Sequence, residues 1–341
     1  NSAGTGAGGD TGSAGAAGST AGAGGTTGGL GGDWPADCEE HYVMTAHGVS
    51  GATDTSKFNV SAGSQEFYQC FFFKAPWGTD EVQALAFKPI IDDTRVVHHW
   101  ILYGADGGNG GSDGQVGGSG CASGAFISGW APGGQGSTLP ADVGLQMPKG
   151  SSAMFGLQIH YNNLAHYTDS MDKSGVEFCV TRHPRTNTAA VHWLGQVAIS
   201  LPPHQSKTVT GQCTPSASMP VHLIGNSPHM HKLGTHATLV INRKGGGQTV
   251  LHDDAFDFAN QTGYALQDVM VMPGDTLTTT CVYNNTTDNT VTFGENTENE
   301  MCFNFVTAWP LNQLVSSGGG LGGLFGGGGT GAGAGSNRCM N

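Results

Sequence analysis

From Trp34 onward, hydrophobic residues occur in short runs that are rich in β-branched and aromatic side chains and are bounded by turn residues. This pattern predicts strands, because such side chains suit a pleated surface. The expected strands lie at 65–73, 82–87, 94–103, 153–162, 174–181, 189–201, 221–224, 235–242, 248–253, 276–283, 291–293 and 301–309. Helix signals are scarce. Many short strands separated by turns predict an all-β protein built from antiparallel β-sandwiches.

The polar stretch 182–188 reads as a linker that divides the β-rich part into halves of about 150 residues, a usual domain size. We therefore expect an N-terminal domain over 34–184 and a C-terminal domain over 185–341. Residues 1–33 hold almost nothing that could be buried, so we expect a flexible tether there. Its placement resembles the spacer of a bacterial surface lipoprotein, which leaves room for a lipid anchor upstream.

Glycine makes up 58 of the 341 residues and gathers in the tether and in two later segments. We expect a long Gly-rich excursion at 104–136 and a Gly-rich loop at 316–336. The loop ends near Cys339, and a disulfide back to the second domain would close it. A frayed terminus with an incidental thiol is the alternative.

Charge narrows the choice of partners. Lys and Arg number 13 and Asp and Glu 26, for a formal net charge of −13, and no basic stripe occurs. This balance argues against nucleic acid and against anionic membrane surfaces. Because no run of 18 apolar residues exists, we expect no membrane-spanning helix.

Eight cysteines are far apart and form no C-x-x-C motif: Cys38, Cys70, Cys121, Cys179, Cys213, Cys281, Cys302 and Cys339. An even, dispersed set predicts four disulfides and an oxidising compartment, so we expect a secreted, periplasmic or cell-surface protein. Eight buried thiols in a cytosolic protein are the alternative.

Three groups stand out among the 14 histidines. His229 and His231 form an H-x-H pair, and residues i and i+2 of a strand face the same way, so both rings could bind one metal ion. His98 and His99 are neighbours, which face opposite ways on a regular strand, so both could bind one metal ion only if the strand twists or bulges or if different ring nitrogens are used. Taken alone, the pair favours one inward structural histidine and one surface histidine. His160 lies in a strand-like run and proves little alone.

Met301 precedes Cys302 at the start of an expected strand. A thioether is a soft ligand that favours Cu(I) over zinc, magnesium or calcium. Combined with histidines in a disulfide-bonded β-protein, it points to redox copper. A blue-copper site is not expected, because that site needs a free thiolate and all eight cysteines can pair.

The order of these motifs resembles a known family. His98-His99 before a hydrophobic strand, Gln158-Ile-His-Tyr, His229-Met-His231 and Glu300-Met-Cys302 follow one another as in the type II copper, ascorbate-dependent monooxygenases. The similarity covers about residues 36–341. It implies two jelly-roll-like β-sandwich domains, disulfide-stapled, and we expect a bacterial member of the family.

The resemblance also implies the site. It places an electron-storing copper ion on His98, His99 and His160, and an oxygen-binding, catalytic one on His229, His231 and Met301. Ascorbate would be the reductant, O₂ the co-substrate, and a substrate C–H bond would be hydroxylated. Gln158 and His222 match family positions as residues that support the ligands, with a structural role equally open for each. The implied disulfides are Cys38–Cys179, Cys70–Cys121, Cys213–Cys339 and Cys281–Cys302.

The chain departs from the peptide-hydroxylating members of that family. Ser227 stands where they carry a carboxylate-binding Arg, and Phe303 and Phe305 replace their Asn and Tyr. We therefore expect a small, partly apolar substrate rather than a Gly-extended peptide. Glu298 and Glu300 could bind an amine, but an acidic surface turn is the preferred interpretation.

Two other functions stay open. The first is a copper-binding or copper-buffering surface protein without turnover. The second is a disulfide-stapled adhesion module with incidental histidines. In each case we expect a monomer.

Overall fold

The computed structural model describes residues 34–61, 65–107, 111–117, 121, 124–311, 313–314 and the backbone of 338–340. These residues form strands, turns and loops and contain no helix, which confirms the all-β prediction. The expected tether at 1–33 and loop at 316–336 lie outside the described residues. No described helix could cross a membrane.

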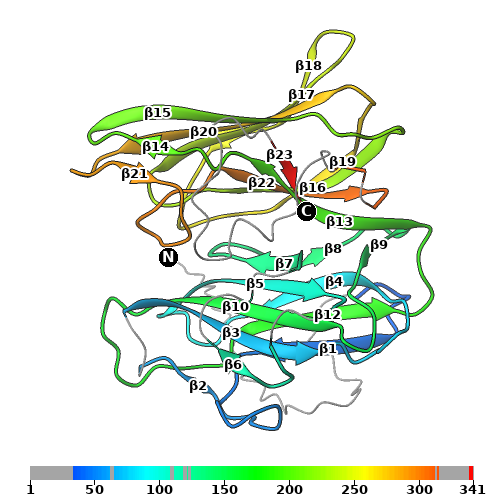
Figure 1. Cartoon of the computed structure of the whole chain (residues 1–341), viewed down its shortest axis with the longest axis vertical. Helices are drawn as coiled ribbons and strands as arrows, with labels where there is room; N and C mark the ends of the chain where they lie inside the picture. Colours follow the sequence, from blue (N-terminus) through cyan, green and yellow to red (C-terminus); the bar gives the residue numbers. More distant parts are fainter. Residues whose placement is uncertain are drawn as a thin grey trace, which may run out of the picture.

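The first sandwich packs two sheets face to face and lies lower in Figure 1. One sheet has the order β1-β12-β4-β9, and the other has the order β6-β3-β10-β5-β7. Short strands β8 and the pair β11-β2 lie beside them. The bounds are β1 Glu40–Thr45, β2 Phe58–Asn59, β3 Glu66–Lys74, β4 Gln83–Ile90, β5 Val97–Ala105, β6 Val116–Gly117, β7 Ala125–Trp130, β8 Ser137–Thr138, β9 Val143–Gln146, β10 Met154–Asn162, β11 Met171–Asp172 and β12 Gly175–Thr181.

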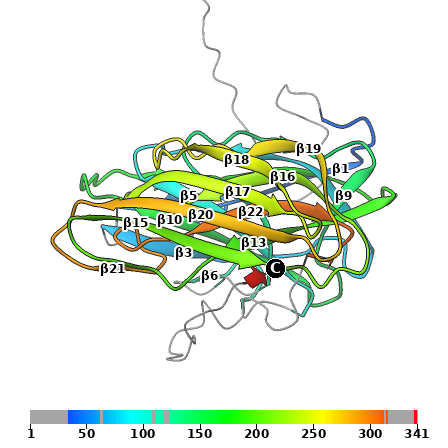
Figure 2. The ribbon, with the colours of Figure 1, turned by 90° about the horizontal axis from the view of Figure 1, so that it is seen from above.

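The second sandwich lies above the first in Figure 1, and Figure 2 looks down on its outer sheet. That outer sheet has the order β15-β20-β17-β18, and the inner sheet has the order β13-β22-β16-β19. The bounds are β13 Asn187–Gly195, β14 Ser200–Leu201, β15 Gln205–Cys213, β16 Val221–His229, β17 Gly234–Asn242, β18 Gln248–Ala255, β19 Tyr264–Val271, β20 Thr276–Asn285, β21 Val291–Thr292, β22 Phe303–Trp309 and β23 Arg338–Met340.

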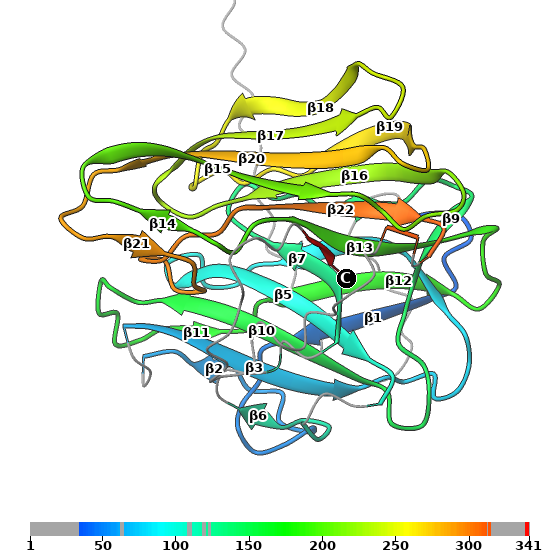
Figure 3. The ribbon, with the colours of Figure 1, turned by 45° about the horizontal axis from the view of Figure 1, so that its top comes forward.

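One parallel ladder joins the two sandwiches. β9 of the first pairs with the start of β13 of the second, with Asn187 opposite Val143 and Ala189 opposite Leu145 (Figure 3). Every other ladder between described strands is antiparallel. A single sheet therefore passes through both sandwiches, and residues 182–186 connect β12 to β13. The expected boundary at 184/185 falls in this connection and stays a prediction.

The described residues of the segment 104–136 include strands that its glycine content did not indicate. It contains β6 and β7, and β7 adds an edge to the β5 sheet with Phe126 and Ile127 buried. The composition does not predict these strands, because Gly lowers strand propensity locally. The two buried apolar side chains of β7 are enough to hold it at the edge of the sheet. β15 was also missed, since most of its side chains face solvent.

Three of the implied disulfides are present. They join Cys38 to Cys179, Cys70 to Cys121 and Cys281 to Cys302. Cys213 is also disulfide-bonded, and the side chain of its expected partner Cys339 lies outside the described residues. The described residues contain no free cysteine, so the alternative of eight thiols is wrong. Disulfides of this number indicate an oxidising compartment.

Candidate metal centre

His98, His99 and His160, here called the first cluster, come together through a β-bulge. Where β10 pairs with β5, His160 lies opposite His99 and Tyr161 opposite Val97, so His98 is an extra residue without a partner. The bulge lets two sequence neighbours face the same way. The Nδ1 atoms of His98 and His99 are 3.1 Å apart. One ring nitrogen from each of the three histidines lies within 4.8 Å of the others.

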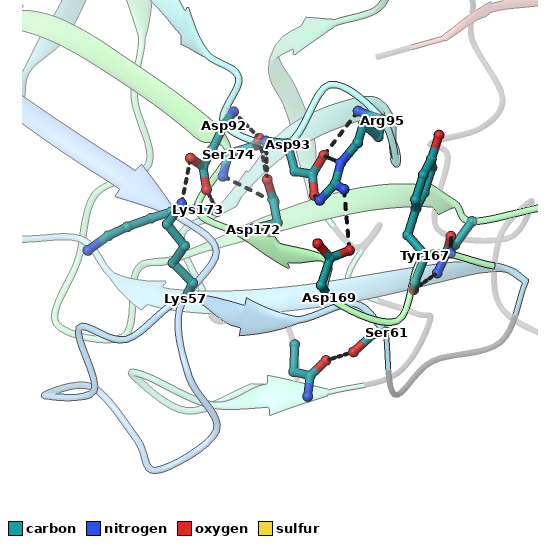
Figure 4. Close-up of polar contacts among 12 residues, drawn as sticks. Lys57, Ser61, Asp92, Asp93, Arg95, Tyr167, Asp169, Asp172, Lys173 and Ser174 are labelled. Atoms are coloured by element: carbon teal, nitrogen blue, oxygen red, sulfur yellow. Dashed lines mark hydrogen bonds and ion pairs between the residues drawn. The ribbon is translucent and has the colours of Figure 1, made fainter. Parts of the chain in front are cut away.

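A polar network that reaches from the surface to buried Asp93 and Asp172 fixes the turn that leads into β5 (Figure 4). Arg95 pairs with Asp93 at 2.8 Å and with Asp169 at 3.3 Å. Asp172 accepts from the backbone N–H of Asp93 and, at 2.8 Å, from the hydroxyl of Tyr161 on β10. The two strands that carry the first cluster are thus joined beside it. Burial raises the pKa of Asp172, and its donors oppose that shift.

The first cluster has the donor set of a metal site. Burial lowers the pKa of His98 and His160 to about 4 and that of His99 well below its ordinary value, so the rings are neutral near pH 7. Neither ring nitrogen of His160 makes a hydrogen bond with a described residue. Its Nε2 lies 2.9 Å from Glu66 Oε1, a contact without hydrogen-bond geometry. Buried, neutral and converging imidazoles fit a metal ion, and three of them suit copper.

His229, His231 and Met301, here called the second cluster, lie where β16 ends and β22 approaches. β16 stops at His229, so the expected strand does not extend through His231. The two rings are 5.4 Å apart and perpendicular. Met301 is 7% exposed and faces the same cavity as both histidines.

Hydrogen bonds set the tautomer of both rings in the second cluster. His229 Nδ1 lies 2.8 Å from Gln261 Oε1, and His231 Nδ1 lies 3.0 Å from the Asn299 carbonyl oxygen. Both oxygens are acceptors, so each Nδ1 carries the proton and each Nε2 keeps its lone pair. Burial lowers the pKa of His229 to about 3 and of His231 to about 4. Two such nitrogens and a thioether fit Cu(I).

The two acidic residues next to Met301 have different roles. Glu300 is fully buried and accepts from the backbone N–H groups of His231, Leu233 and Met301 at 2.7–3.3 Å. Burial raises the pKa of its carboxyl to about 7 despite these donors. Glu298 is exposed and pairs with Lys232 at 2.7 Å. The interpretation as a surface turn therefore holds for Glu298 and is wrong for Glu300, and neither residue lines the cavity.

The two clusters meet across one cavity of about 440 Å³ between the sandwiches. The rings of His99 and His229 are 6.3 Å apart. Phe258 bridges the clusters, with its ring 4.7 Å from His98 and 6.2 Å from His231. Besides His99 and the second cluster, the cavity is lined by Tyr68, Tyr103, Phe126, Gln158, Trp193, Ser227, Glu295 and Phe305, among others.

The structure separates the two supporting candidates. Gln158 is buried on β10 and lines the cavity. His222 lies seven residues before His229 on β16, about 23 Å away at the usual strand rise. Its ring stacks on Trp309 with centroids 3.6 Å apart, and it does not line the cavity. The structure thus does not bring His222 to the second cluster.

Several residues of the site were missed by sequence reasoning. Gln261 and Asn299 support the second cluster, Phe258 bridges the clusters, and Glu66 touches His160. Gln261, Phe258 and Glu66 belong to loops or strand ends far from the ligands in sequence, whereas Asn299 lies two residues before Met301 but 68 residues from His231, the ring that it supports. No local motif identifies such residues, because only the tertiary fold brings them close.

Fold and site together define a two-domain β-sandwich protein with two clusters of neutral metal-binding side chains. The family model for the N-terminal domain of copper type II ascorbate-dependent monooxygenases matches residues 53–168, and the model for the C-terminal domain matches residues 187–316. The chain belongs to the copper type II ascorbate-dependent monooxygenase family.

Several known proteins with similar sequences come from animals. Dopamine beta-hydroxylase of Equus caballus is 28% identical over 278 residues, which are 74% of this chain and 45% of the relative. DBH-like monooxygenase protein 1 of Gallus gallus is 29% identical over 73% of this chain and 45% of the relative. Tyramine beta-hydroxylase of Caenorhabditis briggsae is 32% identical over 55% of this chain and 34% of the relative. The matches thus span between a third and a half of these relatives.

Proposed function

We propose that the protein is a copper-dependent monooxygenase that hydroxylates a C–H bond of a small, partly apolar substrate with O₂. Ascorbate or a similar one-electron reductant would supply the electrons. The observation that supports this most is that a single cavity reaches His99 of the first cluster and all three members of the second. A substrate in that cavity would lie beside both clusters.

In this proposal each cluster holds one copper ion. His98, His99 and His160 would bind the electron-storing ion, and His229, His231 and Met301 the ion at which O₂ reacts. Copper supplies the one-electron redox chemistry when it is bound. The chain supplies neutral imidazoles, fixed tautomers and a largely apolar space that limits water.

The cavity wall supports a substrate with an aromatic or apolar body. Phe126 stacks on Phe305 with ring centroids 5.1 Å apart, and Trp193 packs edge-on against Phe305 at 4.6 Å. Tyr103, 3% exposed, lines the same wall. These rings would enclose an aryl or alkyl group.

Glu295 supports a cationic group on that substrate. It lines the cavity, and no described residue donates a hydrogen bond to its carboxylate. Burial raises its pKa. Burial also raises the pKa of Tyr68 and of Tyr103 in the same wall, and the charge of Glu295 adds to both shifts. An ammonium group would pair with it. Two relatives are named for dopamine and tyramine, both arylalkylamines.

The test is a turnover assay on copper-loaded protein with ascorbate. Arylalkylamines, matched neutral aryl compounds and Gly-extended peptides would be compared as substrates, with product identified by mass spectrometry after ¹⁸O₂ labelling. We expect one labelled oxygen per product for the amines. Glu295→Gln should raise KM for amines and leave neutral compounds unchanged, whereas Glu298→Gln, the matched control, should change neither.

The same assay separates the two alternatives. A copper-buffering protein would retain copper and show no substrate-dependent use of ascorbate. An adhesion module would retain no copper and would tolerate alanine at its histidines. We also propose that the protein works as a monomer and is secreted, periplasmic or at the cell surface. Its disulfides favour such an oxidising compartment.

A further inference from the structure

One oxygen atom of Glu66 meets groups from both sandwiches. Glu66 begins β3, and its Oε1 lies 2.9 Å from His160 Nε2 in the first cluster. The same Oε1 accepts a hydrogen bond from the backbone N–H of Thr297 at 3.1 Å and another from the Thr297 hydroxyl. Thr297 belongs to the second sandwich and is buried. The Glu66 side chain is 19% exposed, so solvent competes little for these contacts.

A second contact from β3 strengthens this junction. Tyr68 lies two residues after Glu66 and therefore on the same face of the strand. Its hydroxyl donates to the Glu295 carbonyl oxygen, and its ring stacks on His160 with centroids 4.4 Å apart and planes 8° apart. β3 thus touches the His160 ring twice and the segment 294–301 twice.

The far end of the segment 294–301 supports the second cluster. The carbonyl of Asn299 holds the ring of His231, the carboxylate of Glu300 holds the backbone at His231, and Met301 is itself a candidate ligand. The segment has no helix or strand of its own and lies between β21 and β22. Its position is therefore set by these contacts together with its own backbone hydrogen bonds, from the Glu300 N–H to the Thr292 carbonyl and from the Gly294 N–H to the Glu300 carbonyl.

We propose that Glu66 is a positioning residue that fixes the His160 ring and the segment 294–301 as one unit. Through this contact the orientation of His160 depends on Thr297 in the other sandwich, and the order of the Met301 segment depends on Glu66. The geometry of the contacts carries the inference: a single carboxylate oxygen lies 2.9 Å from a ring nitrogen of one cluster and accepts hydrogen bonds from two donors of the segment that leads to the other. The importance of this coupling for hydroxylation rests on the proposed function.

The first test uses metal-free protein, so it does not depend on copper binding or turnover. Ring ¹⁵N resonances would be recorded on selectively ¹⁵N-histidine-labelled protein, with His160 assigned from a His160→Gln variant. Thr297→Val removes the hydroxyl donor at nearly constant shape. Thr292→Val, the control, makes the same substitution at the end of β21, where the Thr292 side chain is exposed. We expect Thr297→Val to move the His160 resonance and Thr292→Val to leave it in place.

The reciprocal test follows the segment 294–301 by amide hydrogen exchange in the same metal-free protein. Glu66→Gln removes the negative charge of the group that accepts hydrogen bonds from the Thr297 N–H and hydroxyl. The amide protons of the segment should therefore exchange about ten-fold faster or more. Glu81→Gln is the control, because Glu81 forms an exposed surface ion pair with Lys149. It should leave the exchange rates of the segment 294–301 unchanged. Unchanged exchange in Glu66→Gln, or a His160 resonance that ignores Thr297→Val, would overturn the proposal.

The active protein gives a third readout. Neither Glu66 nor Thr297 lines the cavity, so Glu66→Gln should lower kcat and leave KM unchanged. If the protein takes up no copper, the proposed function is wrong, and the two measurements on metal-free protein still decide the role of Glu66.

Discussion

The two clusters hold their side chains by different means. The first depends on strand register, because the bulge at His98 turns neighbouring residues to one side and ring-to-ring packing orients His160. The second depends on individual hydrogen bonds that its rings donate to Gln261 and Asn299, with Glu300 fixing the backbone. A bulge between paired strands can thus bring the rings of a ligand set together, whereas a set at a strand end depends on hydrogen bonds with loop residues to hold its rings.

The largest expected effect is the separate loss of each copper ion. His160→Ala should remove binding at the first cluster only, and Met301→Leu, which keeps side-chain volume, should weaken Cu(I) at the second only. Each loss should exceed about 100-fold, the upper range for removing a mere supporting contact of a ligand. Copper counts after dialysis and Cu(I) competition with a chelator check this. Retention of full Cu(I) affinity in Met301→Leu would show that the thioether is not a ligand.

The next effect concerns a lone histidine outside both clusters. His192 on β13 is fully buried, and burial lowers its pKa to about 4. An unfolded histidine titrates near 6.5, so the unfolded state gains a proton between pH 6.5 and 4 while the folded state does not. Stability should therefore fall in that window by about 3 kcal/mol from this residue.

His192→Leu isolates that contribution. The difference in unfolding free energy between wild type and variant should change with pH between 6.5 and 4 and be constant above 7. Urea unfolding of metal-free protein at several pH values measures it. A constant difference over the whole range would mean that the pKa of His192 is the same in the folded and unfolded states.

A smaller effect should appear at the carboxylate beneath the second cluster. Glu300→Gln replaces one acceptor oxygen with an NH₂ group and leaves a buried backbone N–H of His231, Leu233 or Met301 unpaired. We expect a loss of about 2 kcal/mol in unfolding free energy. Glu298→Gln, two residues away and exposed, should cost at most about 0.5 kcal/mol. Equal effects of the two substitutions would contradict a supporting role for Glu300 that Glu298 does not share.

The smallest expected effect separates support from ligation. Gln261→Leu removes the acceptor of His229 Nδ1–H and should weaken copper at the second cluster about ten-fold. The first cluster should keep its copper affinity, because the Gln261 side chain forms hydrogen bonds with His229 and Phe258 and not with the first cluster. Titration of each cluster, with the other disabled by His160→Ala or Met301→Leu, measures both. A similar loss at the first cluster would mean that the substitution acts through the whole interface.

The sequence by itself determined the fold class, most strands and the residue types of both clusters. These depend on local patterns: period-two alternation, turn residues, and His or Met spacings that short chain segments display directly. The sequence also indicated that a bulge would let His98 and His99 share a metal ion, but it did not show that the bulge exists. The strands of the Gly-rich segment 104–136 escaped detection because their stability comes from pairing with β5 rather than from their own composition.

Only the tertiary structure decided which side chains surround the clusters. It placed His222 against Trp309, buried Glu300 under His231, brought Glu295 into the cavity wall and set Glu66 against Thr297, 231 residues away. Such contacts join segments whose separation along the chain carries no information about distance in space. The packing of two sandwiches on a shared sheet fixes them, since that packing determines which strand ends and loops face each other across the cavity.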